Sequence, residues 1–267
     1  MEGSVYIKIK DICIEAVKSG GEILIEYYYN RNFLVEEKSM RADFVTTVDK
    51  KVQEVIVEII SKHFPHVNIV AEEKDNVSSN SAFYIDPLDG TLNFIHKFPV
   101  FAISIGYWEN SDPKVGVVYN PITGELYWAV KGRGAYLNGE KINVSKVDSL
   151  GKSLLVTGWP YNRNLLDKVL KDVEGSLKKS QEIRSLGSAA LECCYVARGF
   201  FDGYWEWALS SWDLAAGVLI AKEAGAKVSG IDGREFILEE GNIILSNPFI
   251  HDELVLMLGD KYVTEKK

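Results

Sequence analysis

The chain has 267 residues, 46% of them hydrophobic and 25% charged, which is typical of a globular protein with one large domain or two small ones. Its formal net charge of -8 argues against general binding to nucleic acid or to anionic membranes. Residues 1–4 show no signal-peptide pattern, the apolar run 98–108 is too short to span a bilayer, and the three cysteines suggest no disulfide framework. We therefore expect a cytoplasmic protein.

The first part of the chain predicts two helices separated by a polar segment. Apolar residues recur at helical spacing over residues 6–29, although a pair of glycines weakens the middle of that helix. The segment 30–42 is polar and lacks periodicity, so we expect a mobile surface loop. A second amphipathic helix follows residues 43–49, and Thr47 or Asp49 could cap its start.

Two short strands that end in acidic residues come next. The runs 68–71 and 82–85 are rich in β-branched and aromatic residues and predict neighbouring strands. Their carboxyl ends carry Glu72, Asp86 and Asp89. Because crowded carboxylates repel one another and lose hydration energy, this arrangement indicates a hard divalent cation, and Mg²⁺ fits best.

A tight turn after the second strand predicts the start of a short helix. Pro87 prevents a central strand from continuing, and Gly90 permits the turn, so a helix can begin at Thr91. Its free N–H groups would point back toward the acidic residues, at a place suited to a phosphate. An Asp-Pro-x-Asp-Gly run is also typical of an ordinary turn, and that alternative stays open.

The middle of the chain predicts an antiparallel sheet, because its strands are joined by short turns. A boundary near residues 146–152 divides the chain into an N-terminal α+β half, 1–148, and a C-terminal α/β half, 149–267, which we expect to form one compact unit. The predicted strands of this sheet cover residues 101–107, 115–119, 125–130 and 135–142.

The C-terminal half alternates strands and helices, which predicts a sheet with helices on its faces. Asp213 lies in the first turn of one of these helices and could simply cap it. The predicted strands are 153–157, 181–184, 201–207, 226–229 and 242–245, and the predicted helices are 164–174, 188–197, 212–224 and 248–258.

Three motifs, in this order and at these separations, resemble the set of the inositol monophosphatase family. They are Glu72-Glu73, the run Asp86-Pro-Leu-Asp-Gly-Thr-Leu-Asn-Phe94, and Trp212-Asp-Leu-Ala-Ala-Gly217. Residues 43–49 and 184–190 also match, so the resemblance covers nearly the whole chain. That family belongs to the lithium-sensitive, Mg²⁺-dependent phosphatases, which also include the fructose-1,6-bisphosphatases. The resemblance implies an α+β fold, a layered αβαβα sandwich.

The resemblance also implies a site with two or three Mg²⁺ ions, for which Mn²⁺ can substitute. One ion would be held by Glu72, Asp86 and the backbone carbonyl of Leu88. A second would be shared by Asp86, Asp89 and Asp213. Glu73 points to the opposite face of an extended segment, so we expect it to support the site from behind the ligands.

Further roles follow from the same resemblance. Asp49 would accept a proton, through Thr91, from the attacking water, and the N–H groups of Gly90 and Thr91 would hold the phosphate, with Asp89 beside it. Glu206 would accept hydroxyl hydrogen bonds from a polyol, although it could equally be a solvent-facing strand residue. Arg184 could pair with Glu206 or contact substrate. The expected wall of the substrate site consists of Gly187, Ser188 and Ala189.

The loop 30–42 hangs over the active site in this family, so Glu36, Glu37 or Lys38 could approach a bound metal or phosphate. The alternative for these three residues is a solvated charge run, which the sequence favours.

The function so predicted is Mg²⁺-dependent hydrolysis of a small phosphate monoester, inositol-1-phosphate or fructose-1,6-bisphosphate or both. Alternatives within the class are a 3′-phosphoadenosine 5′-phosphate or NADP phosphatase. From another class, the chain could be an inactive protein that binds a polyol phosphate or a metal. A dinucleotide-binding oxidoreductase would need a glycine-rich fingerprint, and none fits. Because relatives are commonly dimers, we expect a homodimer.

Overall fold

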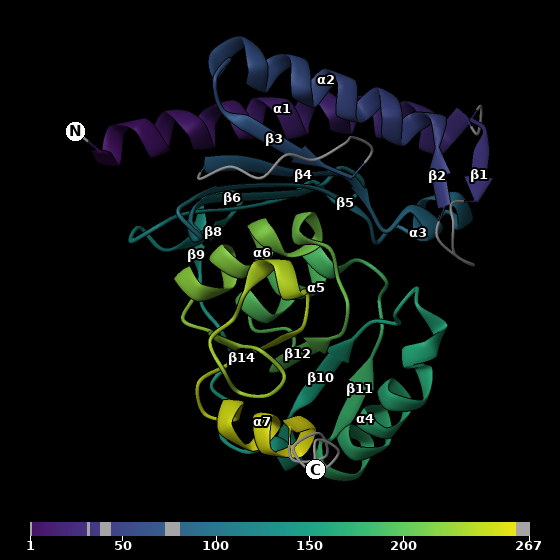
Figure 1. Ribbon diagram of the computed structural model, residues 1–267, viewed down its shortest axis with the longest axis vertical. Helices are drawn as coiled ribbons and strands as arrows, with labels where there is room; N and C mark the ends of the chain where they lie inside the picture. The colour runs from purple at the N-terminus through teal and green to yellow at the C-terminus, as the bar shows by residue number, and fades with distance from the viewer. Residues whose placement is uncertain (1, 31–32, 38–43, 73–80, 260–267) are drawn as a thin grey trace.

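The computed structural model describes residues 2–30, 33–37, 44–72 and 81–259, and these stack as five layers. Figure 1 shows helices over a sheet, further helices beneath it, a second sheet, and more helices on the far side. This confirms the αβαβα sandwich that the sequence predicts. From one outer layer to the other, the helices are α1 (Glu2–Asn30) and α2 (Thr47–His63), then α5 (Ala189–Ala197) and α6 (Ser211–Glu223), then α4 (Leu166–Lys179) and α7 (His251–Gly259).

The larger sheet has seven strands in the order in which they occur in the chain, β3 to β9. All neighbours pair antiparallel, as predicted, except that β3 lies parallel to β4. The parallel pair brings the carboxyl ends of β3 and β4 to the same edge. The strands are β3 (Asn68–Ala71), β4 (Ser81–Asp89), β5 (Ala102–Glu109), β6 (Asp112–Asn120), β7 (Glu125–Val130), β8 (Ala135–Leu137) and β9 (Glu140–Ile142).

The smaller sheet is mixed, in the order β11-β10-β12-β14-β13. The strand β10 pairs parallel with both β11 and β12, whereas β14 pairs antiparallel with β12 and β13. Short elements complete the fold: the helix α3 (Thr91–His96), the 3₁₀ turn η2 (Arg163–Leu165), and the hairpin of β1 (Val35–Glu37) and β2 (Phe44–Thr46). The strands are β10 (Leu154–Thr157), β11 (Glu182–Arg184), β12 (Gly203–Glu206), β13 (Lys227–Ser229) and β14 (Ile243–Ser246).

Some element boundaries differ from the prediction. The predicted strand 135–142 is a hairpin, because Asn138 and Gly139 adopt φ values of 50° and 88° and reverse the chain. Part of the expected loop 30–42 is the strand β1, which pairs with β2. The last helix begins three residues after Pro248, because the side chain of Asn247 accepts hydrogen bonds from the N–H groups of residues 249 and 250 and holds a turn there.

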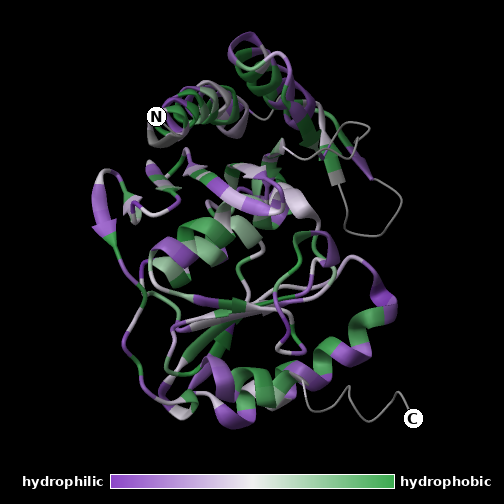
Figure 2. Ribbon diagram, turned by 60° about the vertical axis from the view of Figure 1, so that its left-hand side comes forward, coloured by the Kyte–Doolittle hydropathy of each residue, from purple (hydrophilic) through white to green (hydrophobic). Residues whose placement is uncertain are grey.

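Hydrophobic packing follows the layers. One cluster lies between α1, α2 and the larger sheet, a second surrounds α5 and α6, and a third lies under α4 and α7. The outer helices show both hydrophilic and hydrophobic stretches in Figure 2, as expected for helices with one buried face. Residues 214–221 of α6, by contrast, are all buried. The second cluster includes residues of both predicted halves, so the hydrophobic packing does not divide the chain at residue 148. That boundary stays a prediction.

Within the part of the chain that the structure describes, no helix is both long and apolar enough to cross a bilayer.

Two paired glycines allow α6 to approach the larger sheet closely. Gly106 of β5 lies opposite Gly116 of β6. A Cβ atom on Gly106 would lie 2.7 Å from the backbone of Ala215, and one on Gly116 would lie 2.6 Å from the carbonyl oxygen of Ala216. Trp108 also donates a hydrogen bond from Nε1 to the carbonyl oxygen of Ala215, at 2.9 Å. The sheet therefore fixes the position of the first half of α6.

Replacing Gly106 with alanine tests this contact. Because the methyl group would overlap the backbone of α6, we expect Gly106→Ala to lower the free energy of unfolding by about 1–3 kcal/mol. Gly151→Ala is a matched control, because a Cβ atom there would meet only an ordinary contact at 3.8 Å. The measurement is urea denaturation of the two variants and the wild type. Equal stability of Gly106→Ala and the wild type would contradict the close packing.

Candidate active site

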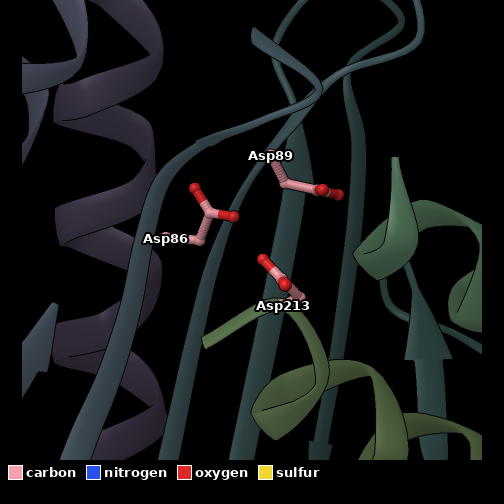
Figure 3. A group of neighbouring side chains, drawn as sticks. All are labelled: Asp86, Asp89 and Asp213. Atoms are coloured by element: carbon pink, nitrogen blue, oxygen red, sulfur yellow. The ribbon is translucent and has the colours of Figure 1, made fainter. Parts of the chain in front are cut away.

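Three aspartates from distant parts of the chain meet at the edge of the larger sheet. Asp86 and Asp89 lie at the end of β4, and Asp213 lies in the first turn of α6. One carboxylate oxygen from each lies within 4.8 Å of the others. Figure 3 shows the three side chains facing a common space. Such an arrangement of oxygen atoms can ligate a hard cation.

A bulge in β4 separates the two aspartates of this strand. Asp86 lies opposite Ser104, but Asp89 lies opposite Ala102, so the bulged strand carries one extra residue. The expectation that the strand ends before Pro87 is therefore wrong. Proline is accommodated because it lies in the bulge, where no ladder hydrogen bond from its nitrogen is needed. The N–H of Leu88 instead donates to Oδ1 of Asp86, at 2.9 Å.

The turn that follows has the geometry expected from the sequence. Gly90 adopts a φ of 92° and precedes α3, which begins at Thr91. A side chain at Gly90 would also meet the carbonyl oxygens of Val100 and Gly187, each 3.1 Å from its Cβ position. Glycine is therefore required there for both conformation and space.

The electrostatics of the cluster favour a cation. Burial, followed by the nearby charges of Glu72, Asp89 and Asp213, raises the pKa of Asp86 well above its usual range. Burial and the charges of Asp89 and Glu72 likewise raise the pKa of Asp213. Burial raises the pKa of Asp89 to about 6, although three backbone N–H groups and a hydroxyl oppose this rise. Holding several buried carboxylates together costs free energy, and a bound divalent ion would offset that cost.

Asp89 is held by the start of α5. Ser188 donates its hydroxyl to Oδ2 of Asp89, and the N–H groups of Ala189 and Ala190 donate to Oδ1 and Oδ2, at 3.1 and 2.9 Å. The polar groups of Ser188 and Ala189, which the resemblance assigns to the substrate wall, thus bind an aspartate of the cluster. Sequence reasoning missed this link, which orients Asp89 and joins the larger sheet to the middle layer.

Asp49 has two functions in the structure, one for each oxygen. Oδ2 accepts the N–H of Thr46, at 2.9 Å, and the hydroxyl of the same residue, while Thr46 Oγ1 accepts the N–H of Asp49. Thr46, and not Thr47, is therefore the N-cap of α2. Oδ1 faces Thr91, whose hydroxyl lies 3.2 Å away. The cap predicted from sequence and a contact with Thr91 thus coexist.

The Thr91 hydroxyl lies between two acceptors, Oδ1 of Asp49 and the carbonyl oxygen of Leu88, the latter at 3.0 Å. A hydroxyl has one hydrogen, so it can donate to one of these at a time. When it donates to Asp49, the Leu88 carbonyl is available for another ligand. Burial raises the pKa of Asp49 to about 6, against the opposing effect of its hydrogen bonds.

The two carboxylate oxygens of Asp213 also have different roles, as those of Asp49 do. Its Oδ2 accepts the N–H of Ser210, at 2.7 Å, which caps α6. Oδ1 is not needed for the cap and can ligate an ion. The capping role that the sequence offers as an alternative therefore does not compete with membership of the cluster.

Two adjoining cavities meet at the cluster, and Asp89, Gly90 and Asp213 line both. One has a volume of about 310 Å³, and its lining includes Thr91 and the other expected metal ligands, Glu72, Asp86 and Leu88. The other has a volume of about 250 Å³, and its lining includes Gly187, Ser188, Ala189 and Glu206. Acidic groups and a substrate-sized space thus lie side by side.

Glu206 is buried, so the alternative of a solvent-facing strand residue is wrong. It lines the 250 Å³ cavity, and Tyr204 donates its hydroxyl to Oε2 at 2.6 Å. Burial raises the pKa of Glu206 to about 7, although the Tyr204 hydroxyl lowers it. A Cβ atom on Gly158 would lie 2.2 Å from Oε1, so the glycine makes room for this carboxyl group.

Some predicted residues lie apart from the cluster. The Arg184 side chain is about half exposed, donates to the carbonyl oxygen of Ile183 and lies 3.7 Å from Glu182. It therefore does not pair with Glu206. Glu36 is exposed and pairs with Lys50, at 3.3 Å, which is the solvated arrangement that the sequence favours.

Glu37 is exposed as well, while Lys38 and Glu73 lie outside the described residues.

Other lining residues were not predicted. Trp159, Tyr161 and Arg163 border the 250 Å³ cavity, and so does Glu192 of α5. The first three lie in the connection after β10, where neither periodicity nor a motif gave a signal. Glu192 is completely buried, and a glutamate within the apolar run 189–197 was the available signal.

Comparison with known proteins agrees with this geometry. The model of the inositol monophosphatase family matches residues 7–262. The chain is 40% identical to a fructose-1,6-bisphosphatase/inositol-1-monophosphatase of Thermotoga maritima, over 94% of this chain and 95% of the relative. The crystal structure of the extragenic suppressor protein suhB from Bartonella henselae superposes with a TM-score of 0.90, at 34% identity, over 94% of this chain and 98% of that one.

An IMPase/NADP phosphatase complexed with Mg²⁺ and phosphate is similar as well, with a TM-score of 0.84 and 26% identity, over 95% of this chain and 96% of that one. The family model and the Thermotoga relative both extend over nearly the entire chain. The protein therefore belongs to the inositol monophosphatase family, whose members hydrolyse phosphate monoesters.

Proposed function

We propose that this chain hydrolyses a small polyol or sugar phosphate with the help of Mg²⁺ ions bound by its acidic cluster. The observation that carries the proposal is the convergence of Asp86, Asp89 and Asp213 beside a cavity large enough for such a substrate. An inactive binding protein would not require Asp49 and Thr91 to be in contact, yet they are. The names of the relatives point to inositol-1-phosphate and fructose-1,6-bisphosphate as the first substrates to test.

The residues present fit a site for two or more Mg²⁺ ions. All the available donors are oxygen atoms, which suits a hard cation, and the mutual repulsion of the carboxylates favours charge neutralisation. Glu72, Asp86 and the Leu88 carbonyl would hold one ion, and Asp86, Asp89 and Asp213 a second. Bound there, Mg²⁺ would offset the charge of the phosphate and promote ionisation of water. A structural relative was crystallised with Mg²⁺ and phosphate.

Thr91 and Asp49 would supply the general base. The Thr91 hydroxyl can accept a hydrogen bond from water while it donates its own hydrogen to Oδ1 of Asp49. As the water oxygen bonds to phosphorus, its proton would pass to Thr91 while the hydroxyl proton of Thr91 passes to Asp49. The bond from phosphorus to the ester oxygen would break at the same time, and the released alcohol oxygen would take up a proton from solvent. Capping by Oδ2 fixes the carboxylate so that Oδ1 keeps facing the hydroxyl.

The leaving group would lie in the cavity lined by Glu206. This carboxylate, oriented by Tyr204, would accept hydrogen bonds from hydroxyl groups of the polyol. Arg163 provides a cation at the same cavity, which would suit the second phosphate of a sugar bisphosphate. Trp159 and Tyr161 are about half exposed and could stack on a base, so the NADP and 3′-phosphoadenosine 5′-phosphate alternatives stay in the test. A homodimer and a cytoplasmic location stay predictions.

Phosphate release from a panel of substrates tests the proposed activity. The panel contains inositol-1-phosphate, fructose-1,6-bisphosphate, NADP and 3′-phosphoadenosine 5′-phosphate, each with MgCl₂ and with EDTA. We expect the fastest release from one of the first two, and none in EDTA, because the acidic cluster cannot bind the phosphate without cations. Release that is equally fast in EDTA would contradict the proposal.

The substitution Asp213→Asn tests the second metal position. We expect the rate of phosphate release to fall by roughly two orders of magnitude or more, because asparagine lacks the charge that attracts the ion. The metal-free variant should be no less stable than the wild type, since asparagine can still accept the Ser210 N–H and one repulsive charge is gone. Activity and thermal melting in EDTA are the measurements. Asp252→Asn, an exposed residue of the first turn of α7, controls for loss of one charge.

The pH dependence of the rate tests Asp49. Because burial raises its pKa to about 6, Asp49 gains a proton, and stops acting as a base, as the pH falls through about 6. At saturating MgCl₂ we expect kcat to be level above that pH and to fall about tenfold per pH unit below it. Asp49→Asn should lower kcat and abolish this dependence. A wild-type kcat that is unchanged down to pH 5 would exclude Asp49 as the base.

A further inference from the structure

Glu192 is a buried glutamate that the proposed mechanism does not use. It lies in the first turns of α5, and its side chain folds back beyond the start of the helix. Oε1 accepts the N–H of Leu186, at 2.7 Å, and the N–H of Gly187, at 3.2 Å. This oxygen fixes the turn that leads into α5 and contributes Gly187 to the cavity.

The second oxygen of Glu192 is unpaired. Oε2 has no hydrogen-bond partner among the described residues, although its surface is completely buried. Three other buried side-chain atoms share this property, on Ser104, Ser176 and Trp205, but none of those residues lines the 250 Å³ cavity, whereas Glu192 does. An unpaired buried polar atom is costly, and this one belongs to a residue that lines the cavity, which suggests that a ligand completes its hydrogen bonding.

The charge state of Glu192 follows from its surroundings. Burial, and then the charge of Glu206, raises the pKa of Glu192 well above its usual range, despite the two N–H groups that oppose this rise. This rise favours the protonated carboxyl group, which can donate a hydrogen bond. Because Oε1 already accepts two N–H groups, the proton belongs on Oε2, which makes that atom a donor. Glu206, in contrast, accepts the hydroxyl of Tyr204.

We propose that Glu192 is a specificity-determining residue, whose Oε2–H donates a hydrogen bond to a hydroxyl oxygen of the substrate beside the acceptor Glu206. This inference rests on the proposed function and names what the cavity recognises. A hydroxyl group both accepts and donates, so a donor next to an acceptor matches it. A leaving group without hydroxyls would form no such hydrogen bonds with Glu192 and Glu206.

Two substitutions separate this contact from the role of Oε1. Glu192→Gln keeps an acceptor for the N–H groups of Leu186 and Gly187 and places an amide donor where Oε2 lies. Glu192→Leu has a similar size but neither function. A matched control is Glu223→Leu, because Glu223 also accepts two backbone N–H groups, those of Gly132 and Gly134, each at 2.7 Å, but does not line the cavity.

The experiment compares kcat/KM for inositol-1-phosphate with that for 4-nitrophenyl phosphate, which has no hydroxyl groups, at saturating MgCl₂. Damage to the turn before α5 would affect both substrates, whereas loss of the hydrogen bond affects only the polyol. In Glu192→Leu we expect the ratio of the two values to fall about tenfold, the effect of one hydrogen bond. In Glu192→Gln and Glu223→Leu the ratio should stay within about threefold of the wild type.

A Glu192→Leu ratio equal to that of the wild type would overturn the inference and leave Glu192 with a structural role alone. So would a Glu192→Gln ratio as low as that of the leucine variant. If Glu192→Leu does not fold, as judged by circular dichroism, Glu192→Met replaces it with the same expected ratio. Failure of the wild type to release phosphate from inositol-1-phosphate, fructose-1,6-bisphosphate and 4-nitrophenyl phosphate alike would instead overturn the proposed function.

Discussion

The repulsion among three aspartates is the constraint on which the rest of the site depends. Asp86, Asp89 and Asp213 come from β4 and α6. Burial raises the pKa of each, and the charges of neighbouring carboxylates raise the pKa of Asp86 and of Asp213 further. Holding them together requires a rigid frame. The bulge in β4 supplies two of them, and the glycines of β5 and β6 let α6 bring the third close to the sheet. The acidic cluster therefore depends on a packing contact outside it, between these glycines and α6.

Carboxylates in this site serve structure and chemistry at once, because each has two oxygens. Asp49 and Asp213 each use Oδ2 to cap a helix, which leaves Oδ1 for Thr91 in one case and for the cluster in the other. Asp89 is held by the start of α5. These bonds fix the orientation of each carboxylate without help from a ligand, and such preorganisation favours both ion binding and catalysis.

The individual strands, helices and acidic residues can be predicted from local patterns, whereas the stacking of the layers and the place of Asp213 beside Asp86 and Asp89 follow from the family resemblance. Strands that end in acidic residues, and a helix with Asp213 in its first turn, can be read directly. The bond between Asp89 and Ser188 could not be predicted, since it depends on how α5 packs against the larger sheet. The position of Glu192 could not be predicted either, because its side chain turns back toward residues that precede its helix. Nor could that of Arg184, which lies on an edge strand and pairs with Glu182.

The most direct test of the central claim, that the three aspartates bind divalent ions, is anomalous X-ray diffraction from a crystal grown with MnCl₂. Manganese scatters anomalously and can replace magnesium at oxygen ligands. The account predicts strong anomalous peaks within about 2.5 Å of carboxylate oxygens of Asp86, Asp89 and Asp213. Ordered crystals that show no peak among these side chains, with manganese bound elsewhere, would contradict it.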